Sequence, residues 1–378
     1  MAKLRAGILS MQRIYNYGSF LQAYGLKSIL EELGCDVEFV DYVPEKCLVK
    51  SFSSNTGVAR KLEKVLEVLR YDACFTDKIR YIRYKRTYGE RFYPLLGIGD
   101  SQNLNPTLDL LVIGSDEVFN CVQDNANVGF TPALFGYGFA DVSRRISYAA
   151  SFGNTTLVKL EKFGVDDKVA GWLSKLDAIS VRDENSGTIV RDLTDAEPNY
   201  NLDPVLAYDY MGKCNKIPAE VGEREEYMIL YGYSGRLSSD ECKSVRAYAD
   251  TNGLKVINIG GIQGCCDQFV DCNPFEVLAY FKSARCVVTD TFHGTIFSTI
   301  TETPFATIVR KEGYGNSEKL TDLLRRLGLS NRAIDKPGDL NSILAAPIEW
   351  EAVRNRIDEG RRETYCYLEK EVGKCTLS

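Results

Sequence analysis

Short apolar runs of strand length recur along this chain, and helical stretches separate them. The first run covers residues 4–9, helically spaced apolar residues then continue to Gly34, and a second run covers residues 37–42. A strand, a helix and a strand in this order predict a β-α-β unit with two parallel strands in one sheet. Because ligands in such sheets bind outside the carboxyl ends of the strands, we expect functional residues in the loops that follow them.

Three further apolar runs in the first half end in small or charged residues. They cover residues 108–113, 145–150 and 178–181, and the segments that close them are Gly114-Ser115-Asp116, Ser151-Phe152-Gly153 and Arg182-Asp183-Glu184. Nearly continuous apolar runs are typical of parallel strands that are buried on both faces. We therefore expect these polar segments to lie together at the ligand-binding edge of the first sheet.

A second series of strands begins after Asp203-Pro204 and a stretch that contains Gly, Pro and Glu. The expected strands cover 227–233, 255–259, 285–289 and 305–309, and the expected helices cover 239–252, a segment through Leu278 and Phe281, 296–300 and the charged tail. With 378 residues, the chain is long enough for two domains. This order predicts an α/β protein in which two β/α domains, 1–204 and 205–348, face each other across a cleft. A helical tail, 349–378, closes the chain.

The charge balance of the chain limits its partners. With 46 Lys and Arg against 52 Asp and Glu, the net charge is −6. A protein that binds nucleic acid without sequence preference needs an excess of basic residues, so no nucleic-acid partner is expected. The first apolar run is too short for a signal peptide, and no uncharged apolar stretch reaches the roughly 18–20 residues of a membrane-spanning helix. These features predict a cytoplasmic protein.

The twelve cysteines are scattered along the chain. Because no secretory signal precedes them, we expect free thiols rather than disulfides. Cys265, Cys266 and Cys272 lie close together in the sequence, but the chain has no Cys-x-x-Cys pair and only one histidine with which to complete a zinc site. The sequence therefore predicts no metal.

One segment is basic within this acidic chain. Residues 58–91 hold ten basic side chains against five acidic ones and have helical character. Such a segment can face an anionic membrane surface or a diphosphate-linked acceptor, which would make the protein membrane-associated. The alternative is a solvated helical insertion in the N-terminal domain, and the sequence leaves both interpretations open.

His293 is the only histidine, so any imidazole chemistry must use it. It lies between the end of an expected strand and a helix start, where unpaired backbone N–H groups and the helix dipole favour an anion. Thr291 and Thr295 add hydroxyl donors, and Gly294 lets a ligand approach the backbone. This turn predicts a site for a phosphate or a carboxylate; the alternative is a structural histidine.

Several common sites lack their signatures in this sequence. No Gly-x-Gly-x-x-Gly follows the first expected strand and no Gly-x4-Gly-Lys-Ser/Thr occurs, so dinucleotide and P-loop phosphate sites are not expected. The chain also has no Gly-x-Ser-x-Gly motif, which argues against a serine hydrolase of the usual type.

Six segments together indicate a family. They are Asn16-Tyr17-Gly18 with Leu21-Gln22-Ala23, residues 114–119, residues 147–153, residues 180–184, Leu202-Asp203-Pro204, and residues 290–298 with Pro304-Phe305. In this order, over about residues 6–330, they resemble the polysaccharide pyruvyl transferase family. The resemblance implies a GT-B-like fold of two Rossmann-like domains. It also implies transfer of the enolpyruvyl group of phosphoenolpyruvate to a pair of sugar hydroxyls as a pyruvate ketal, with release of phosphate and no further cofactor.

On the donor side, the resemblance matches His293 to the family's histidine at the phosphoenolpyruvate site. Ketal formation needs a proton on the enol carbon and a neutralised leaving phosphate, and an imidazole can supply the proton or a charge-assisted hydrogen bond. Arg182 matches an arginine that would hold a carboxylate or phosphate, with ion pairing to Asp183 or Glu184 as the alternative. The other expected donor-binding residues are Thr291, Gly294, Thr295, and the basic residues Lys319 and Arg310, which compete for one role.

On the acceptor side, the resemblance assigns two segments to the sugar. Their residues are Asn16, Tyr17, Gly18, Ser115, Asp116 and Glu117. Either Asp116 or Glu117 would act as the base for the sugar hydroxyl, whereas Ser115 and Asp116 would alternatively cap a following helix. Glu117 and Phe119 replace the common Gln and Trp of the family, and Thr291 replaces a common Ser, so the acceptor sugar stays open.

The resulting interpretation is a pyruvyl transferase that acts on a saccharide precursor of a surface polysaccharide or exopolysaccharide, either free or lipid-linked. One alternative is a GT-B-type glycosyltransferase, which would hold the diphosphate of a nucleotide sugar at the same helix start. The other is a non-catalytic sugar-binding module that keeps the cleft without turnover.

Overall fold

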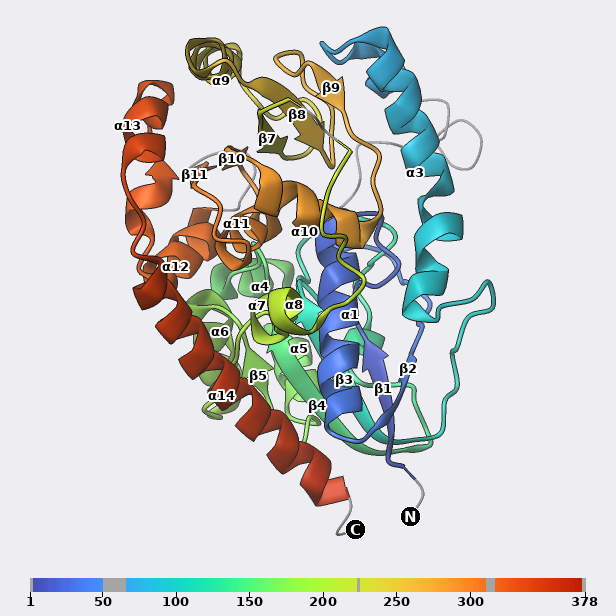
Figure 1. Cartoon of the computed structure of the whole chain (residues 1–378). Coiled ribbons are helices and arrows are strands. Elements are labelled where there is room, and N and C mark those ends of the chain that lie inside the picture. The colour runs from blue at the N-terminus through green and yellow to red at the C-terminus, as the bar shows by residue number, and fades with distance from the viewer. Residues whose placement is uncertain (1–2, 50–65, 223–224, 311–316, 376–378) are drawn as a thin grey trace.

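The computed structural model describes residues 3–49, 66–222, 225–310 and 317–375, and it contains two parallel six-stranded sheets (Figure 1). The first sheet, of order β2-β1-β3-β4-β5-β6, consists of β1 Arg5–Leu9, β2 Asp36–Phe39, β3 Leu108–Asp116, β4 Val142–Ala150, β5 Ser180–Val181 and β6 Asn199–Tyr200. The second, of order β12-β11-β10-β7-β8-β9, consists of β7 Tyr227–Tyr231, β8 Lys255–Ile259, β9 Gln268–Phe269, β10 Cys286–Thr289, β11 Phe305–Ile308 and β12 Ala333–Ile334. These sheets confirm the predicted class, an α/β fold with two Rossmann-like domains in a GT-B-like pair.

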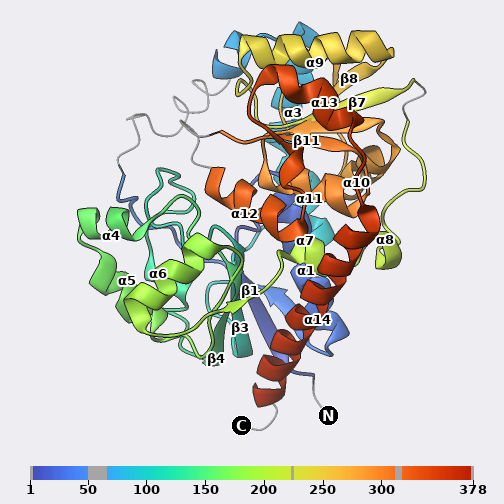
Figure 2. The same ribbon diagram turned by 90° about the vertical axis from the view of Figure 1, so that its left-hand side faces the viewer.

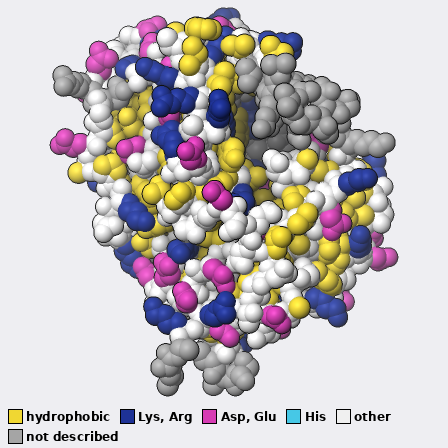
Figure 3. Space-filling model, turned by 90° about the vertical axis from the view of Figure 1, so that its right-hand side faces the viewer, with side chains coloured by type: hydrophobic (Ala, Val, Ile, Leu, Met, Phe, Trp, Pro, Cys, Tyr) yellow, Lys and Arg dark blue, Asp and Glu magenta, His cyan; other side chains and the backbone are white. Residues whose placement is uncertain are grey.

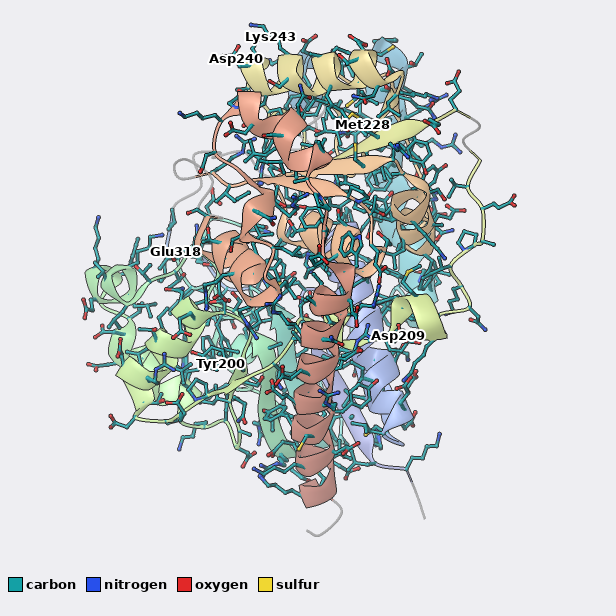
Figure 4. The ribbon with its side chains drawn as sticks, turned by 60° about the vertical axis from the view of Figure 1, so that its left-hand side comes forward. Tyr200, Asp209, Met228, Asp240, Lys243 and Glu318 are labelled. Carbon is teal, nitrogen blue, oxygen red and sulfur yellow. The ribbon has the colours of Figure 1, made fainter. Side chains whose placement is uncertain are left out.

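Helices cover the faces of both sheets, as expected for buried parallel strands. They are α1 Tyr17–Glu32, α3 Phe75–Leu96, α4 Leu157–Phe163, α5 Asp166–Leu173, α6 Glu184–Thr194, α7 Pro204–Ala207, α8 Tyr210–Lys213, α9 Ser239–Asn252, α10 Pro274–Ser283, α11 Phe292–Ile300, α12 Ser317–Leu327, α13 Leu340–Ala345 and α14 Trp350–Cys375. Figure 2 shows α4, α5 and α6 grouped beside the first sheet and α9 and α13 over the second. Met228 of β7 lies beneath α9, while Asp240 and Lys243 lie on the outer side of that helix (Figure 4).

Each sheet reverses its strand order once, between β1 and β3 in the first sheet and between β7 and β10 in the second. The connections that leave the carboxyl ends of two such neighbouring strands run to opposite faces of the sheet, which opens a crevice between them. The loops after β1, β3, β7 and β10 therefore border the expected ligand sites.

The side chain of Asn16 sets the start of α1. Its Oδ1 accepts the backbone N–H of Ser19 at 2.7 Å, which is the N-cap bond of a helix. Tyr17 and Gly18 therefore form the first helical turn. Both residues are buried there rather than exposed in a loop.

Thr291 similarly sets the start of α11. Its hydroxyl accepts the backbone N–H of Gly294 at 2.9 Å, so the helix begins at Phe292. The predicted start at residue 296 is wrong because it rested on apolar spacing alone, which does not register a polar cap. His293 consequently lies inside the first turn of the helix.

The two domains share one apolar core, which surrounds α1. Phe20 and Tyr24 of α1 pack edge-on against Phe275 of α10, with ring centroids 5.7 Å and 4.9 Å apart. The first sheet ends at Tyr200 and the second begins at Tyr227. The predicted boundary at 204/205 falls between these strands, and it stays a prediction together with the boundary at 348/349.

The helix α3 contacts both domains. Its contacts correct the interpretation of residues 58–91 as a solvated insertion. Tyr81 packs against Phe269 of the C-terminal domain, and the hydroxyl of Tyr88 donates to the carbonyl of Asn16 at 2.7 Å. Near its end, Arg91 pairs with Asp271 at 2.8 Å. One face of the helix is thus buried against the rest of the molecule, whereas residues 58–65 lie outside the described residues.

The last helix, α14, turns back along the N-terminal domain (Figures 1 and 2). The Tyr367 hydroxyl donates to the carbonyl of Ser147 in β4 at 2.8 Å. Close by, the buried carboxylate of Glu371 forms an ion pair with Arg144 of the same strand. The final element of the chain is therefore part of the surface of the first domain.

The cysteines are all free thiols, which confirms the prediction. Among the described residues, no helix combines the length and apolar character that are needed to cross a bilayer. The described part of the chain also contains no group of three or more His, Cys, Asp and Glu side chains arranged around a metal position.

Candidate active site

A cleft of about 350 Å³ lies between the two domains. Its walls include the segments that follow β1, β3, β7 and β10, at the order reversal of each sheet. Most of the predicted site residues line it: Asn16, Tyr17, Asp116, Glu117, Arg182, Thr291, His293 and Lys319. The structure thus brings the predicted donor and acceptor sides together, and the roles of the residues stay predictions.

Two predicted glycines lie behind this wall, where they permit close packing. A Cβ atom at Gly18 would lie 2.2 Å from Nδ1 of His293, so the first turn of α1 directly abuts the imidazole. A Cβ atom at Gly294 would lie 2.1 Å from the hydroxyl of Thr289. Both positions require glycine because a neighbouring element approaches closely.

Two other predicted site residues are buried and do not line the cleft. Ser115 is buried and donates to the carbonyl of Ala149 at 2.6 Å. Thr295 is buried in α11, and its hydroxyl donates to the carbonyl of Thr291 at 3.1 Å. No helix follows Ser115 and Asp116, because residues 117–119 form a bend and turn, so the capping interpretation is wrong.

Arg310 does not line the cleft, although it was predicted to bind the donor. Its guanidinium pairs with Glu241 at 3.0 Å and with Asp290 at 3.3 Å. Asp290 itself lines the cleft and is buried; burial raises the pKa of this carboxyl, although Arg236 and Arg310 act in the opposite direction. Arg310 thus lies behind Asp290 in the structure.

The imidazole of His293 lies between aromatic rings and a carboxylate. Its ring centroid is 5.5 Å from that of Phe292 and 6.1 Å from that of Phe297, and its side chain is 13% exposed. On the inner side, Nε2 lies 3.6 Å from a carboxylate oxygen of Asp203. The histidine is therefore largely enclosed, yet it reaches the cleft.

Asp203 is the central residue that the sequence interpretation missed, because Asp203-Pro204 was taken as the end of the first domain and as part of a family segment, with no role for its side chain. Its carboxylate is buried and accepts hydrogen bonds from Arg182 at 2.9 Å and from the backbone N–H of Val205 at 3.0 Å. Burial would raise the pKa of Asp203, but the interactions with His293 and Arg182 outweigh it and lower that pKa. Asp203 therefore carries a negative charge beside the imidazole.

Arg182 is clamped between two carboxylates. It is 4% exposed, pairs with Asp203 at 2.9 Å and Asp116 at 3.3 Å, and stacks over the ring of Phe292 at 4.5 Å. The alternative of an ion pair with its sequence neighbours is wrong, since Asp183 caps α6 instead. Burial would lower the pKa of Arg182, but Asp116 and Asp203 raise it, so the guanidinium stays charged.

Glu117 and Lys319 form an ion pair across the cleft, one from each domain. Asn120 also donates to Glu117, at 2.8 Å. Burial alone would raise the pKa of Glu117, but Lys319 and Arg182 lower it to about 2. A residue predicted for the acceptor and one predicted for the donor thus bind each other.

Arg236 and Tyr233 also line the cleft and were not predicted from the sequence. The guanidinium lies 4.3 Å from the centroid of the Tyr233 ring and 3.9 Å from the Asp290 carboxylate. Both residues follow β7, which ends at Tyr231. The apolar run predicted a strand over 227–233 and carried no signal for a functional loop after it. The cleft is therefore lined by three cationic side chains, those of Arg182, Arg236 and Lys319, each beside a carboxylate.

Several solved structures have a similar overall fold. LpCGTa in complex with UDP has 12% sequence identity and a TM-score of 0.49, with 100% of both chains covered. The calicheamicin glycosyltransferase CalG4 has 15% identity and a TM-score of 0.42 over 99% of this chain and 98% of that one. The O-GlcNAc transferase of Thermobaculum terrenum has 10% identity and a TM-score of 0.43 over 98% of this chain and 66% of that one.

The sequence comparisons give a more specific result. No curated protein matches the chain. The family model described as polysaccharide pyruvyl transferase matches residues 16–312, which include the first helix cap, Arg182, Asp203 and the His293 turn. The match covers well over half of the chain and confirms the resemblance found in the six sequence segments. The chain belongs to the polysaccharide pyruvyl transferase family.

Proposed function

We propose that this protein transfers the enolpyruvyl group of phosphoenolpyruvate to two hydroxyls of a saccharide acceptor, forming a pyruvate ketal and releasing phosphate. The observation that carries the proposal is His293, the only imidazole of the chain, in the first turn of α11, beside an ionised Asp203 and facing a cleft between two domains. Family membership supports the transfer of a pyruvyl group to a saccharide.

The proposed reaction balances with two protons from the acceptor. One sugar hydroxyl adds to C-2 of the enol phosphate while C-3 gains a proton and becomes a methyl group. The second hydroxyl then forms a bond to C-2 as the bond from C-2 to the phosphate oxygen breaks, and its proton leaves with phosphate. The reaction thus requires an acid near C-3, a base near the sugar and cations near the leaving phosphate.

His293 is the proposed acid. An imidazolium beside the Asp203 carboxylate can hold a proton for C-3 or donate a charge-assisted hydrogen bond to phosphate. Thr291 lies at the same helix start, where the backbone N–H groups favour an anion. Asp203 would act as a positioning residue, since it touches His293 and Arg182 but is itself buried behind them.

Arg182 and Lys319 are the proposed cationic ligands of the donor. Arg182 presents its planar guanidinium to the cleft while two carboxylates fix its orientation, which suits recognition of a carboxylate or phosphate. Lys319 is paired with Glu117, so the donor phosphate would compete with this carboxylate for the ammonium group.

Asp116 is the proposed base on the acceptor side. One of its carboxylate oxygens accepts the Ser19 hydroxyl at 2.9 Å and the other pairs with Arg182 at 3.3 Å, which holds the group at the cleft in a fixed orientation. Asn16 and Tyr17 line the same side. No metal and no cofactor other than the donor enters this proposal.

The test is a calorimetric titration of the protein with phosphoenolpyruvate and, in parallel, with a panel of nucleotide sugars. We expect saturable binding of phosphoenolpyruvate that weakens in His293→Ala, and a thermal stabilisation that follows the same concentration dependence. Once an acceptor is available, His293→Ala should lower kcat by about 10²–10⁴-fold, the usual range for one acid–base group.

Arg182→Lys is the companion variant, because a point charge does not replace a planar fork of donors. It should raise the KM for phosphoenolpyruvate. Binding of a nucleotide sugar alone would move the assignment to glycosyl transfer. Sugar binding with no turnover that His293→Ala can reduce would instead indicate a binding module.

A further inference from the structure

The outer face of α3 carries a stripe of apolar and basic side chains. Phe75 is 66% exposed and Ile79 53% exposed. Arg83 and Arg86 follow Ile79 at spacings of four and three residues, so all four side chains lie on one side of the helix. Arg80 is exposed at the flank of this side, where it pairs with Asp77 at 3.8 Å. We refer to Phe75, Ile79, Arg83 and Arg86, together with Arg80 at their flank, as the outer face of α3.

The exposed apolar surface continues into the residues that precede the helix. Leu66 and Leu69 are 46% and 42% exposed. Figure 3 views the molecule from the side on which α3 lies and shows basic side chains gathered next to hydrophobic ones in its upper half. Single exposed apolar residues are ordinary, but several within residues 66–79 beside a row of arginines are typical of a membrane-surface helix.

The charge of this part of the chain is complementary to anionic lipid. Residues 66–91 contain seven basic side chains and only four acidic ones, in a chain whose net charge is −6. One of the acidic residues, Asp77, is buried and accepts the backbone N–H of Phe269 at 2.9 Å, so it faces the protein rather than the outer face. Glu90 is exposed one turn beyond Arg86 on the same side, so three arginines against one facing carboxylate leave the outer face net positive.

The opposite face holds the helix firmly in place. Tyr81, Tyr84, Tyr88 and Phe92 are buried, and their rings pack against one another and against rings of both domains. Lys85 also donates to the carbonyl of Tyr15 at 2.8 Å. The outer face is thus presented on a rigid support and needs no folding step to become available.

We infer that the outer face of α3 docks on a membrane surface that contains anionic lipid. Phe75 and Ile79 enter the interfacial layer of the bilayer, and Arg80, Arg83 and Arg86 contact the headgroup phosphates. The attachment is peripheral, since it needs only one face of a helix whose other face is buried in the protein.

Docking in this way places the cleft beside the membrane. Tyr84, on the inner face of α3, lines the cleft, and the helix also contacts the Asn16 segment at its rim. A saccharide acceptor carried on a lipid diphosphate would then reach the cleft from the bilayer surface. Only this last step rests on the proposed function; docking itself does not depend on any activity.

The test is sedimentation of the full chain with vesicles of phosphatidylcholine alone or of phosphatidylcholine with phosphatidylglycerol, at about 0.15 M and about 0.5 M NaCl. We expect binding only to the vesicles that contain phosphatidylglycerol, with weaker binding at the higher salt concentration. The variant Arg80→Gln/Arg83→Gln/Arg86→Gln should bind about 100-fold more weakly, since each basic residue near an anionic leaflet contributes about a fivefold factor. Phe75→Ser/Ile79→Ser should also weaken binding, but without changing its salt dependence.

A matched control removes three exposed basic residues from the opposite parts of the molecule: Lys175→Gln/Arg362→Gln/Lys370→Gln. This control changes the net charge by the same amount as the α3 triple, and it should bind vesicles as strongly as the wild type does. The proposal is wrong if the wild type stays in solution with phosphatidylglycerol vesicles, or if the control triple and the α3 triple lose binding to the same extent. Unchanged phosphoenolpyruvate binding in the α3 triple separates this result from a failure of the proposed function.

Discussion

The carboxylate of Asp203 has partners from three different parts of the fold. It accepts hydrogen bonds from Arg182 of the β5 edge and from Gln22 of α1, and it lies 3.6 Å from His293 of α11. A buried charge is tolerable only when it is compensated in this way. Asp203 thus joins the proposed acid to the proposed donor clamp, and a change at this residue should affect both.

We expect Asp203→Asn to lower kcat by about 10- to 100-fold, because the neutral amide no longer places a carboxylate beside the imidazole of His293 and no longer fixes Arg182 by an ion pair. The asparagine oxygen can still accept the Val205 N–H that starts α7, which limits the loss of stability. Steady-state kinetics and thermal unfolding of the same samples check this. A lower Tm with wild-type kcat would show that Asp203 only caps the helix.

The ion pair between Glu117 and Lys319 leads to a second prediction, about binding of the donor. If the donor phosphate competes with Glu117 for Lys319, then Glu117→Gln should lower the Kd for phosphoenolpyruvate, by about tenfold for one charge-assisted contact. Lys319→Met should raise it. Calorimetric titration of both variants measures the change, and weaker binding in both would mean that the pair serves only to hold the domains together.

The same pair makes the stability of the protein depend on pH. Because the pKa of Glu117 falls from 4.5 to about 2 on folding, its ionised form stabilises the fold above pH 4.5, and this contribution is lost as the pH falls toward about 2. We expect the wild type to be more stable than Glu117→Gln by about 1–3 kcal/mol near neutral pH, with the difference shrinking at acidic pH. Urea unfolding at several pH values measures it. A difference that is constant with pH would contradict the assignment.

Among the helices, α1 positions the imidazole of His293 through its first turn. Gly18 faces His293 so closely that an alanine methyl would lie 2.2 Å from Nδ1, and α1 cannot retreat because it packs against α10. We expect Gly18→Ala to displace the imidazole and lower kcat by at least tenfold, with a destabilisation of about 1–3 kcal/mol from overpacking. Kinetics and unfolding of the purified variant check both effects.

Gly171→Ala is the matched control for this change. Gly171 is also a helical glycine, in α5, but a Cβ atom there would have no heavy atom within 4 Å. The substitution should leave kcat unchanged and stabilise the protein by a few tenths to about 1 kcal/mol, since alanine favours a helix over glycine. Equal losses of activity in both variants would show that close packing at Gly18 is not the cause.

The elements also show which parts of the structure a single sequence discloses. The bounds of α9 and β8 were predicted correctly because helical spacing, the Ser238 cap and Gly253 all agree locally. The start of α11 was not, since it depends on the polar side chain of Thr291. The bounds of an element can be read from the sequence where its cap and its apolar spacing agree, as in α9, whereas spacing alone misplaces the start where it begins after the cap, as in α11.

The candidate site shows the same limit. The His293 turn and Arg182 could be identified because each stands next to an expected strand end. The interaction of Asp203 with His293 joins residues 90 positions apart, and that of Glu117 with Lys319 crosses between domains. Such pairs arise only when both sheets are assembled. No local signal for them exists in the sequence, which suggested neighbouring residues as partners instead.

At the level of the whole molecule, the shared core predicts how the protein unfolds. The apolar cluster around α1 includes residues of both sheets, and α3 is tied to both domains by aromatic contacts. We expect a single cooperative thermal transition with equal calorimetric and van't Hoff enthalpies, since neither domain keeps a complete core without the other. Differential scanning calorimetry tests this, and two separate transitions would contradict it.

The return of α14 to the first domain has a consequence for synthesis. On the ribosome, the strands of the first sheet emerge before those of the second, but the helix that covers Ser147 and pairs with Arg144 is made only after the second sheet. The first domain therefore cannot complete its surface while the chain grows, and its assembly waits for translation of the second domain. A ribosome-bound chain that ends before Trp350 should remain sensitive to protease at β4, and it should gain resistance only after α14 has emerged.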